Sequence, residues 1–212
     1  MAAQESLARL AASDHHPVQP VDVINDLEGV SPESGTHSRR VAARAHRLGR
    51  RIGLSEPQLD SLRFCGLVHD IGKLGTPERI LHKPSKPVGR ESVIMSAHPL
   101  IGAELGRYEQ FSDEVIEVIL YHHERWDGSG YPAKLAGDGI PLYARIVAVA
   151  DAFDTMLSYR SYKNPRDIEY AVGEIVRCAG TQFDPNLAKV FVQMQVERYT
   201  YLRGMFENFI SA

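Results

Sequence analysis

Helical periodicity runs through the chain from Ser31 onwards, and it restricts the fold more than any other feature of the sequence. Apolar residues recur three or four positions apart in successive segments, which are separated by turns rich in glycine and proline. The alternation of apolar and polar residues that marks a half-buried strand is nearly absent. The sequence therefore predicts an all-α fold.

Capping residues and prolines set the expected helix boundaries. Ser31 followed by Pro32 is typical of a helix start, and this first helix is expected to end near Gly53. Residues 76–87 contain two Lys-Pro steps and are expected to form a loop with one helical turn at most. Residues 127–141 are rich in glycine and form a long predicted loop, with a small hairpin as an alternative. The other expected helices cover residues 55–72 and 112–126 with Ser55 and Ser112 as caps, 90–107 with a break at His98 and Pro99, 141–160, 164–180 and 184–210.

Three segments are expected along the chain. Residues 1–29 are predicted to be an N-terminal helical extension with a linker, residues 30–197 the main domain, and residues 198–212 a C-terminal helix. The amphipathic tail, residues 196–210, is expected either to pack into the core, which we favour, or to contact a second copy of the chain in a homodimer.

Ionisable side chains interrupt the most apolar helices. His69, Asp70 and Lys73 stand in the apolar stretch that begins at Phe64, and Asp151 stands in the most apolar predicted helix. Burying an unpaired charge costs several kcal/mol, so each carboxylate needs a cation, a hydrogen-bond network or a metal ion. Hard or borderline divalent metals take oxygen and imidazole ligands of this kind. A site with several cations would keep Asp70 and Asp151 ionised inside the fold.

Each of these residues also has an ordinary structural explanation. Asp151 could pair with Arg145 or Arg39, and Glu33 at a helix start could interact only with the helix dipole. Taken alone, histidines such as His37 and His98 most often lie at a surface or in a hydrogen-bonded core. Single cations such as Lys73 and Arg160 most often lie at a surface. Their joint occurrence, in this order on apolar helices, favours a metal site. We expect no ligand role for the remaining candidates, which are His15, His16, His46, His82, Cys65, Cys178 and Trp126.

The composition excludes several classes of function. The 212 residues carry a formal charge of −3 with both signs mixed, which argues against binding a nucleic-acid polymer but not against a small anion in a local basic pocket. Two distant cysteines give no disulfide framework. Neither a signal peptide nor an apolar run of about 20 residues is visible. We therefore expect a cytoplasmic protein with no membrane contact.

Three motifs together resemble the HD-GYP family, a branch of the HD-domain metal-dependent phosphohydrolases. They are HDIGK at residues 69–73, HHERWDGSGYP at 122–132 and RIVAVADAFDTMLSYRSYK at 145–163. The similarity extends from Glu33 to Val192 and includes GTQFDP at 180–185. This resemblance implies a helical bundle of the HD-domain type with a C-terminal helical extension.

The resemblance also implies a set of ligands for two divalent metal ions, and for a third ion that some members hold. The implied ligands are His37, His69, Asp70, His98, His122, His123 and Asp151, with Glu33 for the third ion. Lys73, Arg160 and Lys163 match positions that contact the phosphates and bases of the substrate. Tyr131 belongs to the signature loop at the substrate entrance. Ligands without cysteine suit iron or manganese, which we favour, or nickel or zinc.

The implied activity is the hydrolysis of cyclic di-GMP. Asp70 would bridge two metal ions that share a hydroxide as nucleophile, and Lys73 would stabilise the charge that builds on phosphorus. Attack would open the ring to linear pGpG, and a third ion held by Glu33 could favour a second cut to GMP. Two alternatives stay open. One is a phosphohydrolase for another cyclic or linear nucleotide, and the other is a weakly active cyclic di-GMP receptor whose Gly-Tyr-Pro loop contacts a diguanylate cyclase or an adaptor.

Overall fold

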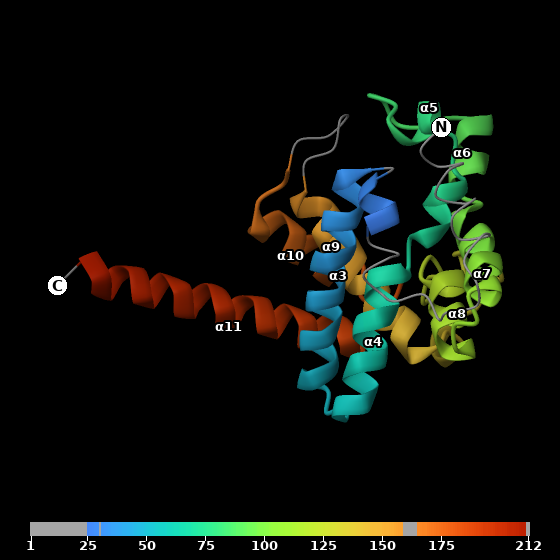
Figure 1. The fold of residues 1–212 in the computed structure, drawn as a ribbon. Coiled ribbons are helices and arrows are strands. Elements are labelled where there is room, and N and C mark those ends of the chain that lie inside the picture. Colours follow the sequence, from blue (N-terminus) through green and yellow to red (C-terminus); the bar gives the residue numbers. More distant parts are fainter. Residues whose placement is uncertain (1–24, 30, 159–164, 211–212) are drawn as a thin grey trace.

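The computed structural model describes residues 25–29, 31–158 and 165–210, and these residues form an all-helical fold (Figure 1). The expected fold class is thereby confirmed. A short helix over residues 25–29 comes first. The labelled elements are α3 (Pro32–Arg51), α4 (Glu56–Val68), η1 (Ile71–Gly75), α5 (Glu78–Leu81), α6 (Arg90–Met95), α7 (His98–Tyr108), α8 (Asp113–Tyr121), η2 (Gly137–Gly139), α9 (Leu142–Leu157), α10 (Ile168–Arg177) and α11 (Pro185–Ile210). Within the described ranges, the only β-pairing outside helices is an isolated bridge between Ala179 and Phe183.

The loop between α8 and α9 does not form the small hairpin that the sequence left as an alternative. Its backbone amides pair with a different segment. The N–H groups of Trp126 and Asp127 donate to the carbonyls of Gln182 and Thr181, at 3.2 and 2.9 Å. Because the turn between α10 and α11 satisfies these groups, the loop needs no strand partner of its own.

The core lies where α3, α4 and α9 pack together, with α8, α10 and the first turns of α11 around them. The apolar helix α9 is buried on most of its sides. Its Phe153 meets Phe191 of α11 edge to face, with 5.0 Å between the ring centroids. Leu27, from the short helix that precedes α3, also belongs to this core. Helices α3 and α9 pack directly against each other in this core, which places polar residues of both helices in one site.

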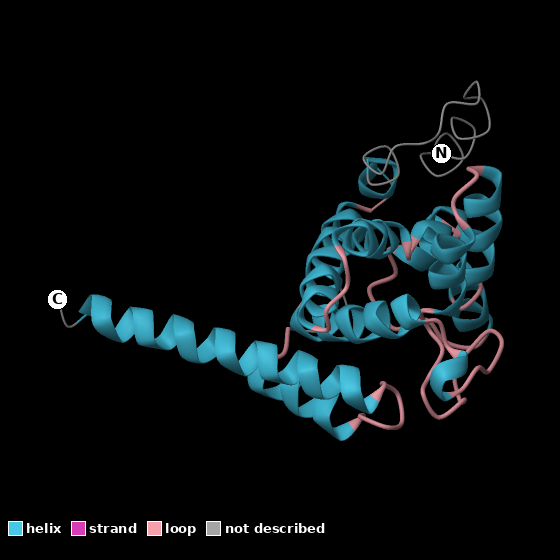
Figure 2. Cartoon of the chain, turned by 90° about the horizontal axis from the view of Figure 1, so that it is seen from below, coloured by secondary structure: helices cyan, strands magenta, loops and turns pink. Residues whose placement is uncertain are grey.

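Helix α11 extends well beyond the bundle (Figure 1, Figure 2). Leu187 and Phe191 are buried near its start, whereas Val196 and Tyr199 are 53% and 48% exposed. The favoured expectation that the tail packs into the core is therefore wrong for Val196 and Tyr199. No described helix combines the length and the apolar content that a membrane span requires.

Ser31 takes the N-cap position of α3 as expected, and its removal should weaken this helix. The backbone of Ser31 is extended, and its buried Oγ accepts a hydrogen bond from the N–H of Ser34 at 3.3 Å. Ser31→Ala is expected to cost about 1 kcal/mol of unfolding free energy, or roughly 2–4 °C in melting temperature. Thermal unfolding followed by circular dichroism measures this loss.

Ser112 provides the matched control for this prediction. It also takes an N-cap position, that of α8, but its side chain makes no cap hydrogen bond. Ser112→Ala should therefore change stability by less than about 0.5 kcal/mol. Equal losses in Ser31→Ala and Ser112→Ala would contradict the role given to the Ser31 hydroxyl.

Candidate metal centre

Two clusters of potential metal ligands lie next to each other where five helices meet. One cluster is His37, His69 and Asp70, and the other is His98, His122 and His123. In each cluster the donor atoms lie within 4.8 Å of one another. The expected ligands from distant parts of the chain are thus brought together.

Most of these residues stand at helix ends. His69 and Asp70 lie at the junction of α4 and η1, His98 begins α7, and His122 and His123 follow α8 directly. Consecutive residues within an α-helix point about 100° apart, so they cannot share one site easily. Where the helix ends, the backbone changes direction. The pairs His69–Asp70 and His122–His123 can therefore each contribute both side chains.

Asp70 connects the two clusters. Its Oδ1 lies 3.3 Å from Nε2 of His98 and 3.9 Å from Nε2 of His122. Its Oδ2 lies 3.4 Å from Nε2 of His69 and 3.9 Å from Nε2 of His37. Each carboxylate oxygen thus faces a different cluster, and a single residue can bind a cation in both.

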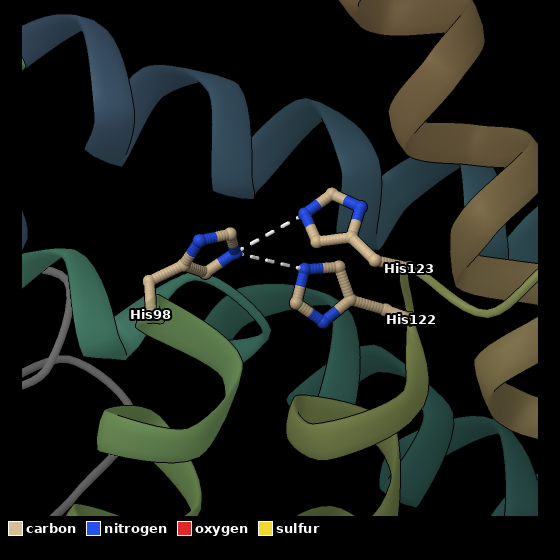
Figure 3. Close-up of side chains that lie close together, drawn as sticks. All are labelled: His98, His122 and His123. Carbon is tan, nitrogen blue, oxygen red and sulfur yellow. Dashed lines mark hydrogen bonds between the residues drawn. The ribbon is translucent and has the colours of Figure 1, made fainter. Parts of the chain in front are cut away.

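The second cluster is compact and directs its nitrogens inward. Figure 3 shows Nε2 of His98 facing both other rings, at 3.2 Å from Nε2 of His122 and 3.1 Å from Nε2 of His123. Burial, together with the charge of neighbouring histidines, lowers the pKa of His122 well below its usual value. Burial also lowers the pKa of His123, to about 4. Both imidazoles are therefore neutral near pH 7 and keep a lone pair for a metal ion.

Backbone carbonyls fix which nitrogen of three histidines carries the proton. The Nδ1 contacts are His69 with Gly66 at 2.9 Å, His98 with Met95 at 2.7 Å and His122 with Ile119 at 2.9 Å. A carbonyl oxygen only accepts hydrogen bonds, so Nδ1 must donate in each case. Nε2, which faces the site, is then the ring nitrogen that is left to bind a metal ion. Metal-binding histidines are typically oriented in this way.

His37 lies between carboxylates from α9. Its Nε2 is 3.0 Å from Oδ1 of Asp151, and its Nδ1 is 2.8 Å from Oδ2 of Asp154. Burial lowers the pKa of His37, but hydrogen bonds and charges from Asp151 and Asp154 raise it to a net value of about 9. A positive charge at this place is thus strongly favoured. The sequence alternatives for Asp151 are wrong: Arg145 pairs with Asp138 and Asp184, and Arg39 pairs with Glu28.

The two buried carboxylates are ionised. Burial raises the pKa of Asp70. The charges of Lys73 and His69 lower this pKa by more than burial raises it, so the net pKa lies well below the usual value. Burial likewise raises the pKa of Asp151, and the hydrogen bond and charge of His37 overcome that rise.

Donor chemistry and burial fit a divalent cation in these clusters. Nε2 of His37 and Nε2 of His69 are buried, and each faces a carboxylate oxygen, that of Asp151 at 3.0 Å and that of Asp70 at 3.4 Å. Neutral imidazoles and ionised carboxylates are the ligands that iron, manganese, nickel and zinc accept. The described His and Asp clusters could therefore bind metal ions.

Known proteins resemble this chain over most of its length. A family model described as an HD domain matches residues 23–187. The chain belongs to the HD-domain family. The relatives below, together with the motifs, confirm the expected HD-GYP branch. The residues that this model matches include His69 and Asp70.

Two curated relatives of this HD domain are phosphodiesterases. A 3'3'-cGAMP-specific phosphodiesterase 2 of Vibrio cholerae is 40% identical over 174 residues, which cover 81% of this chain and 33% of the relative. A cyclic di-GMP phosphodiesterase of Thermotoga maritima is 39% identical over 182 residues, which cover 84% and 49%. The chain thus spans between a third and a half of the length of these relatives.

A solved structure has a similar fold. The crystal structure of a cyclic GMP-AMP specific phosphodiesterase of V. cholerae, V-cGAP3, is 28% identical and superposes with a TM-score of 0.59. The match covers 84% of this chain and 47% of that one. A protein of Bdellovibrio bacteriovorus described as HDG"Y"P shares the fold at 15% identity, with a TM-score of 0.65.

A cavity of about 900 Å³ opens over both clusters of this HD domain. Lys73 lines it and donates from Nζ to Oδ2 of Asp70. Tyr131 lines it as well, and its ring stacks on His123 with 5.0 Å between centroids. Burial raises the pKa of Tyr131 to about 12, so the phenol stays neutral. The cavity therefore combines a wall of candidate metal ligands with the ammonium group of Lys73 and the phenol ring of Tyr131.

Three expected site residues, Glu33, Arg160 and Lys163, are not among the residues of the two described clusters. Glu33 lines the cavity with an exposed side chain and is in neither cluster. Arg160 and Lys163 lie outside the described residues. The metal-ligand role of Glu33 and the substrate contacts of Arg160 and Lys163 stay predictions.

Sequence reasoning missed two buried carboxylates beside the site. Asp154 accepts hydrogen bonds from His37 and from Nε of Arg40, at 2.8 Å in both cases. Glu124, next to His123, accepts at 2.6 Å from the backbone N–H of Ala133 and so anchors the signature loop. The available signal for Asp154 was its position three residues after Asp151, one helical turn away on the same side of α9.

Proposed function

We propose that this HD domain is a metal-dependent phosphodiesterase that hydrolyses a cyclic dinucleotide, with cyclic di-GMP as its substrate. The observation that carries this proposal is the position of Asp70. Its two oxygens face two histidine clusters at the wall of one cavity. A carboxylate shared between two cation sites is typical of centres that cleave phosphate esters.

The chain's own residues would divide the remaining work. Divalent ions, when bound, supply Lewis-acid polarisation of the phosphodiester and lower the pKa of a water molecule. Lys73 lines the cavity, where it would bind a non-bridging phosphate oxygen and stabilise the negative charge that builds there in the transition state. Tyr131 covers the ring of His123 and limits the access of bulk water on that side.

The finer parts of the proposal concern the metals and the product. We favour iron or manganese, with nickel or zinc as alternatives, because the donors are imidazoles and carboxylates without cysteine. Glu33 at the cavity supports the hypothesis of a third ion, which would favour the further cut of pGpG to GMP. Arg160 and Lys163 would add contacts to phosphates and bases.

A second candidate substrate is 3'3'-cGAMP. The names of two relatives favour it, since one curated phosphodiesterase at 40% identity and one solved structure at 28% are described as specific for cyclic GMP-AMP. Both substrates present the same phosphodiester to the metal wall. They differ only in one base.

The partner proposals rest on exposed groups. The signature loop exposes Asp127, Ser129 and Lys134, which are available to a diguanylate cyclase or an adaptor. The exposed Val196 and Tyr199 on α11 support the proposal of a homodimer.

A substrate panel on the metal-loaded chain tests the proposed function. We expect cyclic di-GMP to be converted to pGpG faster than 3'3'-cGAMP or cyclic di-AMP, with products separated by chromatography. EDTA should abolish turnover, and added Mn²⁺ or Fe²⁺ should restore it. Faster turnover of 3'3'-cGAMP would identify the second candidate. Turnover that persists in EDTA would contradict the metal dependence. No turnover of any dinucleotide by the metal-loaded chain would contradict an enzymatic role and leave the receptor alternative.

A further inference from the structure

Asp154 sits behind the metal-facing edge of His37, where no ligand role was predicted for it. The carboxylate is completely buried on α9, and its Oδ2 lies 2.8 Å from Nδ1 of His37. The opposite ring atom, Nε2, is the one that approaches Asp151 and Asp70. Asp154 therefore contacts His37 on the side away from the candidate metal position.

Two arginines and a serine hold this carboxylate in place. Nε of Arg40 donates to both oxygens of Asp154, at 2.8 and 3.0 Å, and Nε of Arg44 donates to Oδ1 at 3.2 Å. The hydroxyl of Ser158 donates to Oδ2 at 3.1 Å, and the same hydroxyl accepts from Arg40 at 2.8 Å. Surrounded by these donors, Asp154 is an ionised acceptor, so Nδ1 of His37 must be the donor in their hydrogen bond.

His37 differs in this respect from three other histidines of the site. His69, His98 and His122 donate from Nδ1 to backbone carbonyls, which the helix ends supply whatever the side chains are. His37 instead depends on a side chain from another helix. A carboxylate also withdraws the proton more strongly than a carbonyl does, which makes the opposite nitrogen a better metal donor.

We propose that Asp154 is a positioning residue for the metal centre: by accepting from Nδ1 of His37, it leaves Nε2, on the ring edge that faces Asp70 and Asp151, as the nitrogen that binds a metal ion. This inference rests on the proposed function, because it assumes that the clusters bind metal. Arg40 and Arg44 act one step further out, by fixing the orientation of Asp154.

Zinc binding by the full chain tests this proposal without any substrate. Asp154→Asn keeps the size of the side chain but removes its charge, so it should weaken zinc affinity by roughly 10–100-fold at one of two sites. Titration of the metal-free protein with zinc chloride against a competing chelator measures the change. Elemental analysis after dialysis should find about half of the wild-type zinc.

Asp184→Asn is the matched control. Asp184 is also a buried carboxylate that accepts from an arginine, Arg145 at 2.8 Å, but it contacts no metal-site residue in the described structure. We expect it to lose stability without losing zinc affinity. Equal zinc affinities in wild type and in folded Asp154→Asn would overturn the proposal. The same holds if Asp154→Asn binds zinc normally and fails only in binding cyclic di-GMP, which would make Asp154 a substrate contact.

Nuclear magnetic resonance of the zinc-loaded wild type keeps the proposal testable even if Asp154→Asn does not fold. Long-range ¹H–¹⁵N spectra of the imidazoles should show His37 with its proton on Nδ1 and zinc on Nε2. The opposite tautomer, or zinc on Nδ1, would overturn the role of Asp154. A wild-type chain that takes up no zinc, manganese or iron would instead contradict the proposed function, and the inference would fall with it.

Discussion

Asp70→Asn is expected to reduce hydrolysis of cyclic di-GMP by at least roughly a thousandfold and to lower the metal content of both clusters. Asp70 faces His69 with one carboxylate oxygen and His98 with the other. The amide of asparagine keeps the shape of the side chain but lacks the negative charge that would balance two metal ions and the ammonium group of Lys73. Losing several kcal/mol of transition-state stabilisation corresponds to about this factor in rate. Elemental analysis and product chromatography measure the two effects.

Asp60→Asn serves as the control for this variant. Asp60 is exposed on α4, the helix that leads to Asp70, and should tolerate the same chemical change with unaltered turnover and metal content. A folded Asp70→Asn protein that kept a full complement of metal and more than a tenth of the wild-type rate would rule out a bridging role for this carboxylate.

Gly72→Ala is expected to destabilise the protein by about 3 kcal/mol or more. Gly72 in η1 packs against the start of α7, and a Cβ atom there would overlap the carbonyl oxygen of His98 and lie 2.5 Å from the amide nitrogen of Gly102. Both neighbours are backbone atoms, so the clash can be relieved only by moving α7. Because His98 is the first residue of α7, its ring would move away from Asp70. We expect a melting temperature lower by roughly 6–12 °C and weaker metal binding.

Gly173→Ala makes the same substitution where space is available. Gly173 lies within α10, and a Cβ atom there would meet nothing within 4 Å among the described atoms. Alanine should stabilise this helix by about 0.5–1 kcal/mol through its better helix propensity. If Gly72→Ala melted at the wild-type temperature or above, the close packing of η1 against α7 would be wrong.

Helix positions could be predicted from the sequence because they depend on nearby residues. The start at Ser31 and Pro32 and the break before Pro99 follow from capping and from the missing amide of proline. The break was expected at His98 and Pro99, but the structure has it two residues earlier, at Ser96 and Ala97, so that His98 begins the next helix. The loop between α8 and α9 was less certain, since the amides of Trp126 and Asp127 bond to residues more than 50 positions away.

The pairing of charges could not be predicted from the sequence. Asp154 was passed over, and Asp151 was expected to have arginine as an alternative partner. In the folded chain His37 takes both carboxylates, and Asp154 is separated from His37 by 117 positions and from Arg40 by 114. Several arginines were available, and only the packing of α3 against α9 selects among them.

The sequence alone determined the helices and the kinds of ligand they carry, because capping, periodicity and side-chain chemistry act over a few neighbouring residues. Only the tertiary structure decided that Asp70 lies between two histidine clusters, that Gly72 must lack a side chain and that Asp154 orients His37. Those outcomes depend on distances between helices far apart in the chain, and such distances are set when the apolar faces of α3, α4 and α9 pack together.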